Sequence, residues 1–333
     1  MTLMKQTSLG LGNSMKRTRK REFLAEMERV VPWSALVELV APFAPDGRRG
    51  RPPFSVQTML RIHFMQQWFT LSDPAMEESL HDMPLLREFA GLGGWSDRLP
   101  DESTILRFRH LLEKHKLAAQ ILETVNALLS GKGLLLRVGT VVDATLIAAP
   151  SSTKNRSGER DPEMHQSKKG NQWYFGMKAH IGVDAESGLV HTVRGTSGNV
   201  CDVVEANSLL HGQESEAFGD AGYQGAHKRP DATERVRWTI AMRPGKRAAL
   251  DKTRVLGQLT DQLERLKASI RAKVEHPFRV IKRQFGHVKV RYRGLKKNTA
   301  QLTTLFALSN LWMARKKLDA LYGKVRPQMG GLA

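Results

Sequence analysis

One stretch of the chain decides the fold: GTVVDATLI, at residues 139–147. β-Branched and apolar residues fill it on both sides of Asp143, and such a run is typical of a buried central strand. We expect this strand to extend over residues 134–147. A lone carboxylate is costly to bury, so Asp143 lies in a loop, is satisfied by backbone donors, or faces a metal ion together with other acids. The strand alone leaves these interpretations open.

A second acidic residue, Asp220, stands at the end of another short apolar run. The run EAFG at residues 216–219 predicts a strand, and small residues follow it. Such a strand presents the carboxylate at its C-terminal tip, where the chain enters a tight turn. Asp220 is therefore a candidate to meet Asp143 at one edge of a sheet.

The third acidic residue, Glu275, lies in a long segment with helical spacing. Apolar residues recur at helical intervals over about 258–284, and Pro277 should kink or restart the helix. At this spacing Arg271, Glu275 and Lys282 lie along one face. Two strand-borne aspartates and one helix-borne glutamate would form a three-carboxylate site suited to Mg²⁺, which prefers oxygen ligands. Mn²⁺ is the expected substitute.

Composition points to a polyanionic partner. The chain has 333 residues, enough for two domains, and a net charge of +19. This excess favours nucleic acid or an anionic membrane over a merely soluble basic protein. The single cysteine, Cys201, fits a reducing compartment and is expected in the core. The N-terminal residues contain no apolar run long enough for a signal peptide, and no stretch approaches the roughly 20 apolar residues of a membrane span, so we expect a cytoplasmic nucleic-acid protein.

Changes in pattern divide the chain into four parts. The basic run KRTRKR at residues 16–21 could touch phosphates or be a solvated tail, and the run SGKG at 130–133 separates a helical pattern from strands. The expected parts are a basic flexible arm at 1–21, a helical N-terminal DNA-binding domain at 22–132, a catalytic domain at 133–323 and a tail at 324–333.

The helical domain shows several start and stop signals. Pro32 should break the segment 22–43, Ser55 is a plausible N-cap of a helix over 55–69, and Asp73 can cap a helix that has Pro74 at its first position. A further helix opens at residues 100–104.

That further helix carries two arginines, Arg107 and Arg109, which are candidates to bind DNA. Short helices with turns between them, the last bearing arginines, are compatible with a helix-turn-helix reader, although ordinary helical bundles share the pattern. Large aromatic residues of this domain are expected in its core. They are Trp33, Phe64, Trp68, Phe69 and Trp95.

The second domain mixes strands with helices. Residues 150–172 are polar and cannot form core, so we expect a loop that contacts substrate. Asp202 could support the active site or cap a helix, and we favour the cap. The remaining expected elements are strands at 173–184, 189–195, 216–219 and 237–242, helices at 200–210 and 298–321, and a basic extended run at 288–294. This order predicts an α/β fold with a mixed sheet flanked by helices.

Further residues of the second domain are candidates for DNA contact. Lys168 and Lys169 lie in the polar loop, and Arg291 and Arg293 lie in the extended run, where they could form a stripe for phosphates. Trp173 could stack on an unpaired base or belong to the core, with the core somewhat favoured.

These blocks together resemble the DDE transposases of bacterial insertion sequences, most closely the group named for insertion sequence five. The three acidic blocks carry the resemblance: VDAT at 142–145, GDAGY at 219–223, and Arg271, Glu275 and Lys282. Other similar stretches are KGNQWYFGMK at 169–178, IKRQFG at 281–286, DPAMEE at 73–78 and LRFRH at 106–110. One departure is Ala268, where the family motif often has a tyrosine.

The resemblance implies an RNase H-like catalytic domain that cleaves and joins DNA at the terminal inverted repeats of its element by a two-metal mechanism with Mg²⁺. Carried over residue by residue, Asp143, Asp220 and Glu275 are the catalytic and metal-binding triad, and Arg271 and Lys282 contact phosphate. Expected partners are double-stranded DNA, as terminal repeats and as target, and further copies of the chain in a homodimer or larger assembly. Neither a membrane nor a small-molecule substrate is expected, and the location is the bacterial cytoplasm at the nucleoid.

Two alternatives remain open at this point. One is a nuclease of the same fold that cuts DNA without joining it. The other is a DNA-binding regulator that derives from a transposase and has no catalytic activity. Metal-dependent cleavage separates the regulator from both enzymes, and strand transfer of precut ends separates the nuclease from the transposase.

Overall fold

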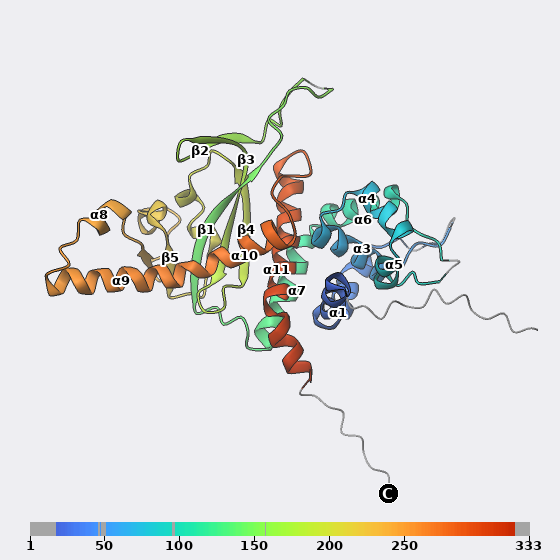
Figure 1. Ribbon diagram of the computed structural model, residues 1–333, viewed down its shortest axis with the longest axis horizontal. Coiled ribbons are helices and arrows are strands. Elements are labelled where there is room, and N and C mark those ends of the chain that lie inside the picture. Colours follow the sequence, from blue (N-terminus) through green and yellow to red (C-terminus); the bar gives the residue numbers. More distant parts are fainter. Residues whose placement is uncertain (1–17, 46, 48–50, 95–96, 157, 324–333) are drawn as a thin grey trace, which may run out of the picture.

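The computed structural model describes residues 18–45, 47, 51–94, 97–156 and 158–323. The tail at 324–333, most of the arm at 1–21, and Trp95 lie outside these residues. A group of helices, the helical half, lies on one side, and a sheet with its own helices, the sheet half, lies on the other (Figure 1). The helices α7 (Leu117–Gly131) and α11 (Leu295–Gly323) lie between them. Among the described helices, none combines the length and apolar character needed to cross a membrane.

The helical half consists of short helices whose ends the sequence marks. Pro32 separates the first two helices, as expected, and the Ser55 hydroxyl caps the next by accepting from the Thr58 backbone N–H at 3.0 Å. Ser72, rather than Asp73, caps the fourth, accepting from the Ala75 backbone N–H at 3.2 Å. The helices before α7 are α1 (Arg19–Val30), α2 (Trp33–Val40), α3 (Val56–Phe69), α4 (Asp73–Asp82), α5 (Pro84–Ala90) and α6 (Glu102–Lys114), with a 3₁₀ turn at Ala41–Phe43.

Aromatic side chains fill the core of the helical half. Trp33, Phe64 and Trp68 are buried, and Phe69 packs against them from a partly buried position. The rings of Trp33 and Phe64 lie 5.7 Å apart between centroids. The expected core role of these four aromatic residues is confirmed.

The sheet contains both antiparallel and parallel pairs. Strand β3 pairs antiparallel with β1, β2 and β4, whereas β1, β5 and β6 run parallel to one another in that order. This arrangement, flanked by helices, confirms the predicted RNase H-like mixed sheet. The strands are β1 (Gly139–Ala148), β2 (His165–Lys169), β3 (Gln172–Asp184), β4 (Val190–Ser197), β5 (Glu216–Gly219) and β6 (Arg237–Ile240).

Three segments of the sheet half differ from expectation. The first strand begins at Gly139 rather than at residue 134, because Arg137 has a φ of 57°, which no strand tolerates. The polar segment 150–172 contains a strand, β2, which forms a hairpin with β3 around Gly170. Residues 200–210 form 3₁₀ turns at Asp202–Val204 and Asn207–Leu209 instead of an α-helix. The valines, asparagine and serine of that segment are poor helix formers.

The long helical segment near the C-terminus is irregular around Pro277. Pro277 lacks an N–H and its ring crowds the carbonyl four residues earlier, and the helix tightens into a 3₁₀ turn just before it, at Ala272–Val274. A π-helical turn follows at Val280–Gln284. The helices here are α8 (Pro244–Ala248), α9 (Val255–Arg271) and α10 (Glu275–Arg279).

The two faces of the sheet are covered by different parts of the chain. Val141 belongs to the large core, whereas its neighbour Val142 packs on the opposite face with Leu209 and Tyr223. On the large-core side α7 and α11 pack together against β4. Asn310 on α11 joins them, because its side-chain amide donates to Asn126 Oδ1 at 2.8 Å and to the Val190 carbonyl at 2.7 Å. The helical and sheet halves therefore share one core.

Candidate active site

Asp143 lies in the middle of β1, half-buried on the face that carries the large core. Its Oδ1 accepts from the Ala144 backbone N–H at 2.7 Å. Burial first, and then the negative charges of Asp220 and Glu275, raise the pKa of Asp143 to about 7, against the lowering effects of the Ala144 backbone hydrogen bond and the Arg271 guanidinium. The three predicted acidic residues therefore lie within electrostatic reach of one another.

Asp220 is held by the turn that follows β5. Its Oδ1 accepts from the Gly222 backbone N–H at 2.8 Å and so caps the 3₁₀ turn Ala221–Tyr223. A Cβ on Gly222 would lie 2.9 Å from that same oxygen, and a Cβ on Gly219 would lie 2.9 Å from Tyr223 Cβ. The glycines on either side let the strand end in a turn tight enough to fix this carboxylate.

Glu275 begins α10, and two basic residues of the same segment lie around it. Arg271 ends α9, and Lys282 lies on the π-helical turn. The Lys282 ammonium donates to Thr145 Oγ1 at 2.7 Å and to the Leu146 carbonyl at 3.0 Å, which ties this turn to β1. Burial lowers the pKa of Lys282, the nearby Lys169 lowers it further, and Glu275 opposes this shift. Lys282 thus connects the strand of one acid to the helix of another.

The donor set has the chemistry of a site for a hard divalent cation. All three acids offer carboxylate oxygens, and their mutual repulsion in a partly buried place is what a bound cation would relieve. Among the described residues, no three His, Cys, Asp or Glu side chains are already arranged to hold a metal ion. Asp143, Asp220 and Glu275 would therefore have to draw together around it, on elements whose positions are fixed by the sheet and by Lys282.

Two further residues, Tyr223 and Asp202, lie near these acids, and sequence reasoning assigned no role to Tyr223. The Tyr223 hydroxyl is buried and has no hydrogen-bond partner among the described residues. Burial raises the pKa of Tyr223, and so do the charges of Asp143, Asp202 and Asp220. Asp202 is not the helix cap that we favoured, because it begins the 3₁₀ turn Asp202–Val204, which has Cys201 at the N-cap position. Its Oδ1 instead accepts from the Lys178 ammonium at 2.9 Å. Tyr223 was visible in the GDAGY run, but only the fold shows that it reaches the acids.

The β2–β3 hairpin carries exposed groups suited to DNA. Lys168, Lys169 and Trp173 all face solvent, and Trp173 is 63% exposed, so the favoured core position of this tryptophan is wrong. The Lys168 ammonium lies 6.0 Å from the centroid of the Trp173 ring.

The expected core position of Cys201 is also wrong, because this cysteine is exposed.

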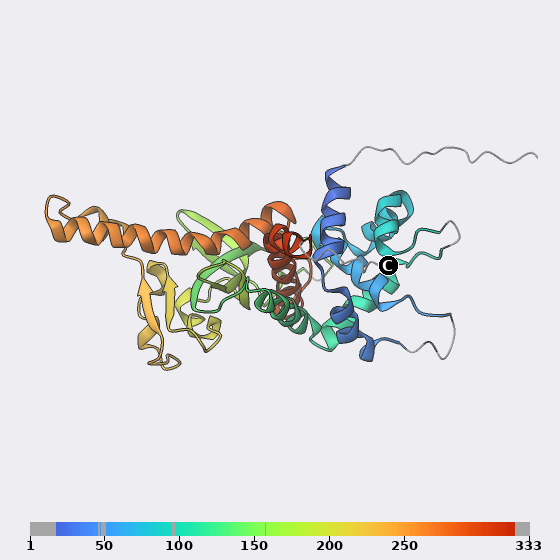
Figure 2. The ribbon, with the colours of Figure 1, turned by 90° about the horizontal axis from the view of Figure 1, so that it is seen from below.

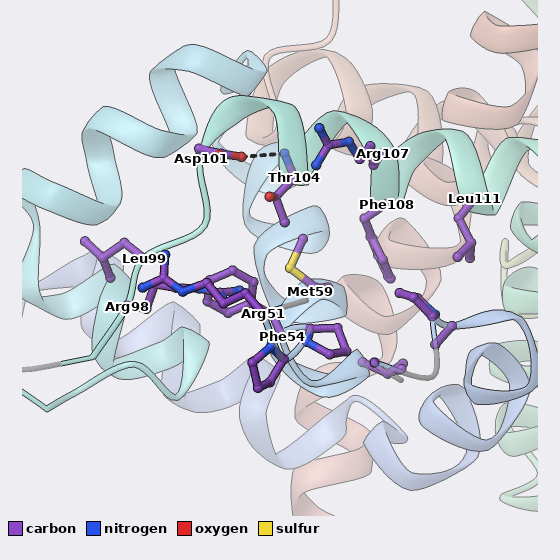
Figure 3. Close-up of a pocket in the computed structure, with 16 residues that line it drawn as sticks. Arg51, Phe54, Met59, Arg98, Leu99, Asp101, Thr104, Arg107, Phe108 and Leu111 are labelled. Atoms are coloured by element: carbon purple, nitrogen blue, oxygen red, sulfur yellow. Dashed lines mark hydrogen bonds between the residues drawn. The ribbon is translucent and has the colours of Figure 1, made fainter. Parts of the chain in front are cut away.

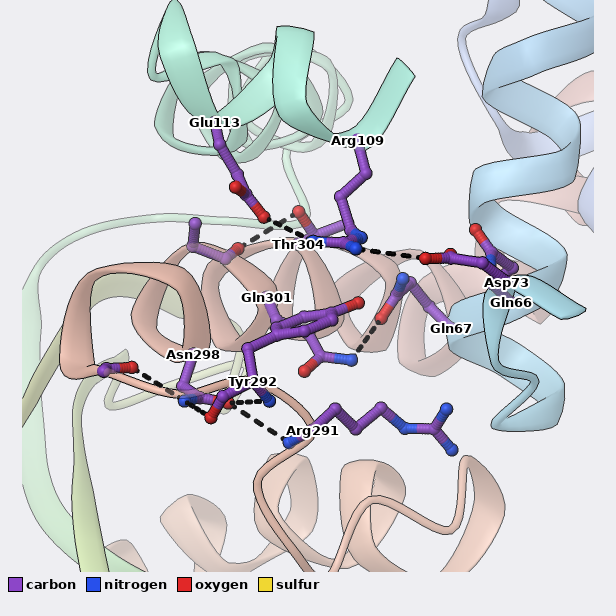
Figure 4. A network of polar contacts seen from close by, with 12 residues as sticks. Gln66, Gln67, Asp73, Arg109, Glu113, Arg291, Tyr292, Asn298, Gln301 and Thr304 are labelled. Carbon is purple, nitrogen blue, oxygen red and sulfur yellow. Dashed lines mark hydrogen bonds and ion pairs between the residues drawn. The ribbon is translucent and has the colours of Figure 1, made fainter. Parts of the chain in front are cut away.

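Arg109 does not lie where a DNA-binding residue should. It is 7% exposed, and its guanidinium pairs with Asp73 Oδ2 at 3.0 Å and Glu113 Oε1 at 2.9 Å, over the ring of Tyr292 (Figure 4). Arg291 is half-buried, and its Nη2 donates to the Thr70 carbonyl. Both arginines hold the helical half against the sheet half, which corrects the expectation that Arg109 reads DNA.

Arg107, two residues from Arg109, is exposed on the opposite side of α6. It stands at a cavity of about 690 Å³ between α3, α6 and the segment before α3 (Figure 3). Arg51 and Arg98 also line this cavity, and Arg98 stacks on the Phe54 ring at 3.8 Å. The lining of the cavity therefore combines apolar side chains with three arginines and Asp101. Arg293, just before α11, is also exposed.

Two family models match the chain. A model described as a transposase DDE domain matches residues 135–311, more than half of the chain. A second, described as a transposase domain (DUF772), matches residues 13–111. The first covers all three acidic residues and the second covers most of the helical half.

Proposed function

The chain belongs to the transposases that carry a DDE domain, and from this premise we propose that it cleaves and joins DNA at the terminal inverted repeats of its own insertion sequence. Asp143, Asp220 and Glu275 are the proposed catalytic and metal-binding residues. The single observation that carries the proposal is that these three acids, from two strands and a helix, come close enough for the charges of Asp220 and Glu275 to act on Asp143, inside the region that matches a transposase DDE domain. The resemblance to the group of insertion sequence five remains a prediction.

Each residue of the site has a role in this proposal. Bound divalent cations, Mg²⁺ or its substitute Mn²⁺, would activate a water or a 3′-hydroxyl and stabilise the leaving oxygen. The chain supplies positioning, because phosphoryl transfer needs charge neutralisation and in-line geometry rather than a covalent nucleophile. Asp220 is fixed by its turn, and Lys282 holds the Glu275 segment against β1. Arg271 offers a positive charge for phosphate beside Asp143.

Exposed basic groups supply the proposed DNA surface. Lys168, Lys169 and Trp173 on the β2–β3 hairpin would contact DNA close to the acids, because Lys169 lies near enough to Lys282 to lower its pKa. Arg107 and Arg293 would contact phosphates farther away. The net charge of +19 supports binding to double-stranded DNA as both terminal repeat and target.

The test replaces each acid and separates binding from chemistry. Asp143→Ala, Asp220→Ala and Glu275→Ala should each abolish Mg²⁺-dependent cleavage of a terminal-repeat duplex while the affinity for that duplex is retained. Glu123→Ala, at an exposed acid on α7, is the control and should cleave normally. Cleavage that persists in any of the three variants contradicts the assignment.

A second assay distinguishes transposition from simple nuclease action. Precut terminal-repeat ends with free 3′-hydroxyls should be joined to a supercoiled target by the wild-type chain. A chain that cuts but never joins would be a nuclease, and a chain that binds DNA without metal-dependent cleavage would be a regulator.

A further inference from the structure

Helix α9 exposes a row of leucines to solvent and buries two of its acidic residues. Leu256, Leu259, Leu263 and Leu266 are 78%, 57%, 51% and 64% exposed. On the same helix the charged residues Asp261 and Glu264 are each only 4% exposed. A surface helix normally buries its apolar stripe and exposes its charges, so this stripe lacks a partner within the described residues.

Specific polar contacts fix the helix in this orientation. Asp261 pairs with Arg247 at 2.9 Å, and Glu264 accepts from the Met242 backbone N–H at 2.8 Å. Gly257 lets the preceding loop approach closely, since a Cβ there would lie 1.9 Å from the Asp251 carbonyl oxygen. The helix therefore cannot rotate its leucines inward without leaving two carboxylates unpaired.

The exposed leucines have the spacing of a coiled-coil seam. Leu256, Leu259, Leu263 and Leu266 are separated by three, four and three residues, and Ile270 continues the pattern after four more. This is the a and d pattern of a heptad repeat, which a second helix of the same kind fills. Figures 1 and 2 show α9 reaching beyond the sheet on the side away from the helical half.

The positions beside the seam do not oppose self-association. In the heptad frame the flanking e and g positions hold Thr260, Gln262, Lys267 and Ser269, of which only Lys267 is charged. The Lys267 ammonium is already paired with Glu264 at 2.7 Å. A second α9 would thus meet leucines without facing an unpaired like charge.

We propose that two copies of this chain pair through α9, with Leu256, Leu259, Leu263 and Leu266 as the seam. The seam spans about 15 Å from its first to its last leucine at roughly 1.5 Å per residue, which is short for an isolated coiled coil. The pair should therefore be weak in free solution and strengthened when both copies hold DNA. The use of this pair to bring two DNA ends together rests on the proposed function, whereas the pairing itself does not.

The first experiment measures the mass of the full chain by sedimentation equilibrium between about 1 and 100 µM, the range in which weak interfaces dissociate. The wild type should shift from monomer to dimer, and the double variant L259Q/L266Q should stay monomeric across the range. Both substitutions fall on exposed positions, so circular dichroism and thermal unfolding should match the wild type. Ala268→Gln, on an exposed position of α9 outside the seam, should dimerise normally.

Disulfide cross-linking then locates the contact. In a Cys201→Ser background, Leu263→Cys should cross-link in either helix orientation, because it lies at the centre of the run from Leu256 to Ile270. Leu256→Cys should cross-link to its own copy only if the helices are parallel. A wild-type monomer at every concentration, normal dimerisation of L259Q/L266Q, or absence of the Leu263→Cys cross-link would each overturn the seam. Wild-type monomers that bind anionic vesicles through α9 would overturn it as well.

The seam and the proposed function can fail separately. A chain that pairs through α9 but never cleaves terminal-repeat DNA keeps the seam and loses the function. In an active chain, L259Q/L266Q should bind a single terminal repeat with unchanged affinity and lose at least tenfold in the joining of paired ends.

Discussion

Asp143 is a carboxylate placed where its neutral form is favoured. Burial raises its pKa from 3.8 to about 7, so the folded chain binds a proton more tightly than the unfolded chain over that window. Stability of the metal-free protein should therefore fall as the pH rises from about 4 to about 7, and the full cost should be present above pH 7. A bound cation would offset this cost, because its charge would stabilise the ionised form of Asp143.

Removing that charge should stabilise the metal-free protein. Asp143→Asn should raise the free energy of unfolding at pH 8 by on the order of 3 kcal/mol, and the gain should vanish near pH 4. Urea unfolding at the two pH values, with EDTA present, measures the difference. The same variant should be inactive in cleavage, and a variant that is no more stable than wild type at pH 8 would contradict the buried position of this charge.

Gly222 should be required for chemistry rather than for stability. A Cβ at this position would lie 2.9 Å from Asp220 Oδ1, so Gly222→Ala should displace that carboxylate and lower the cleavage rate by about tenfold or more. Gly245→Ala is the matched control, because a Cβ there meets nothing within 4 Å. Equal cleavage rates for the two variants would show that the turn does not position Asp220.

Single residues also show where sequence reasoning reached its limit. Arg107 and Arg109 looked equivalent as basic residues of one helix, yet only Arg109 shares the buried face of Ile105 and Leu112. The spacing of four and three residues was available in the sequence and could have separated them. The nearness of Tyr223 to Asp143 could not be predicted, because it depends on a contact between β1 and the turn after β5, which are far apart in the chain.

At the scale of elements, the spacing of apolar residues predicted those strands and helices whose formation depends on local sequence alone. The strand at 216–219 has the predicted bounds, and the broken helix at Pro32 and the helical segment around Glu275 were also predicted. The strand β2 was missed because it is polar on both sides and depends on pairing with β3. The apolar spacing of residues 200–210 predicts a helix, but the structure has two 3₁₀ turns there, whose period is close to that of an α-helix.

The π-helical turn that carries Lys282 makes a prediction at this scale. Lys282→Met removes both hydrogen bonds to β1 and should lower cleavage by about tenfold or more, because the Glu275 segment loses its attachment near Asp143. Affinity for a single terminal repeat should change little. Arg283→Met, at the exposed neighbouring position, is the control, and a loss of binding that matches the loss of cleavage would instead indicate a phosphate contact.

At the scale of the whole molecule, Arg109 pairs with two acids inside the helical half and lies over the ring of Tyr292, in the segment that precedes α11. Arg109→Leu leaves Asp73 and Glu113 without their shared partner and should lower the free energy of unfolding by about 3 kcal/mol. Arg107→Ala, two residues away and exposed, should leave stability unchanged and weaken DNA binding with a smaller salt dependence. Thermal unfolding and binding titrations at several salt concentrations separate the two effects, and the opposite pattern would contradict these assignments.

The shared core of the two halves has a consequence for where the DNA is cut. The asparagine contacts of α7 and α11, the stacking of Arg109 on Tyr292 and the Arg291 hydrogen bond to Thr70 connect the helical half to the sheet half, so we expect the two halves to keep a fixed separation. In the proposed function the helical half recognises the terminal repeat and the sheet half cuts it, so we expect the protein to set the offset from the recognised base pairs to the scissile phosphate, at about 3.4 Å for each base pair. If extra base pairs are inserted between the recognised sequence and the natural cleavage point, cleavage at that point should be lost, because the protein should not bend enough to reach it.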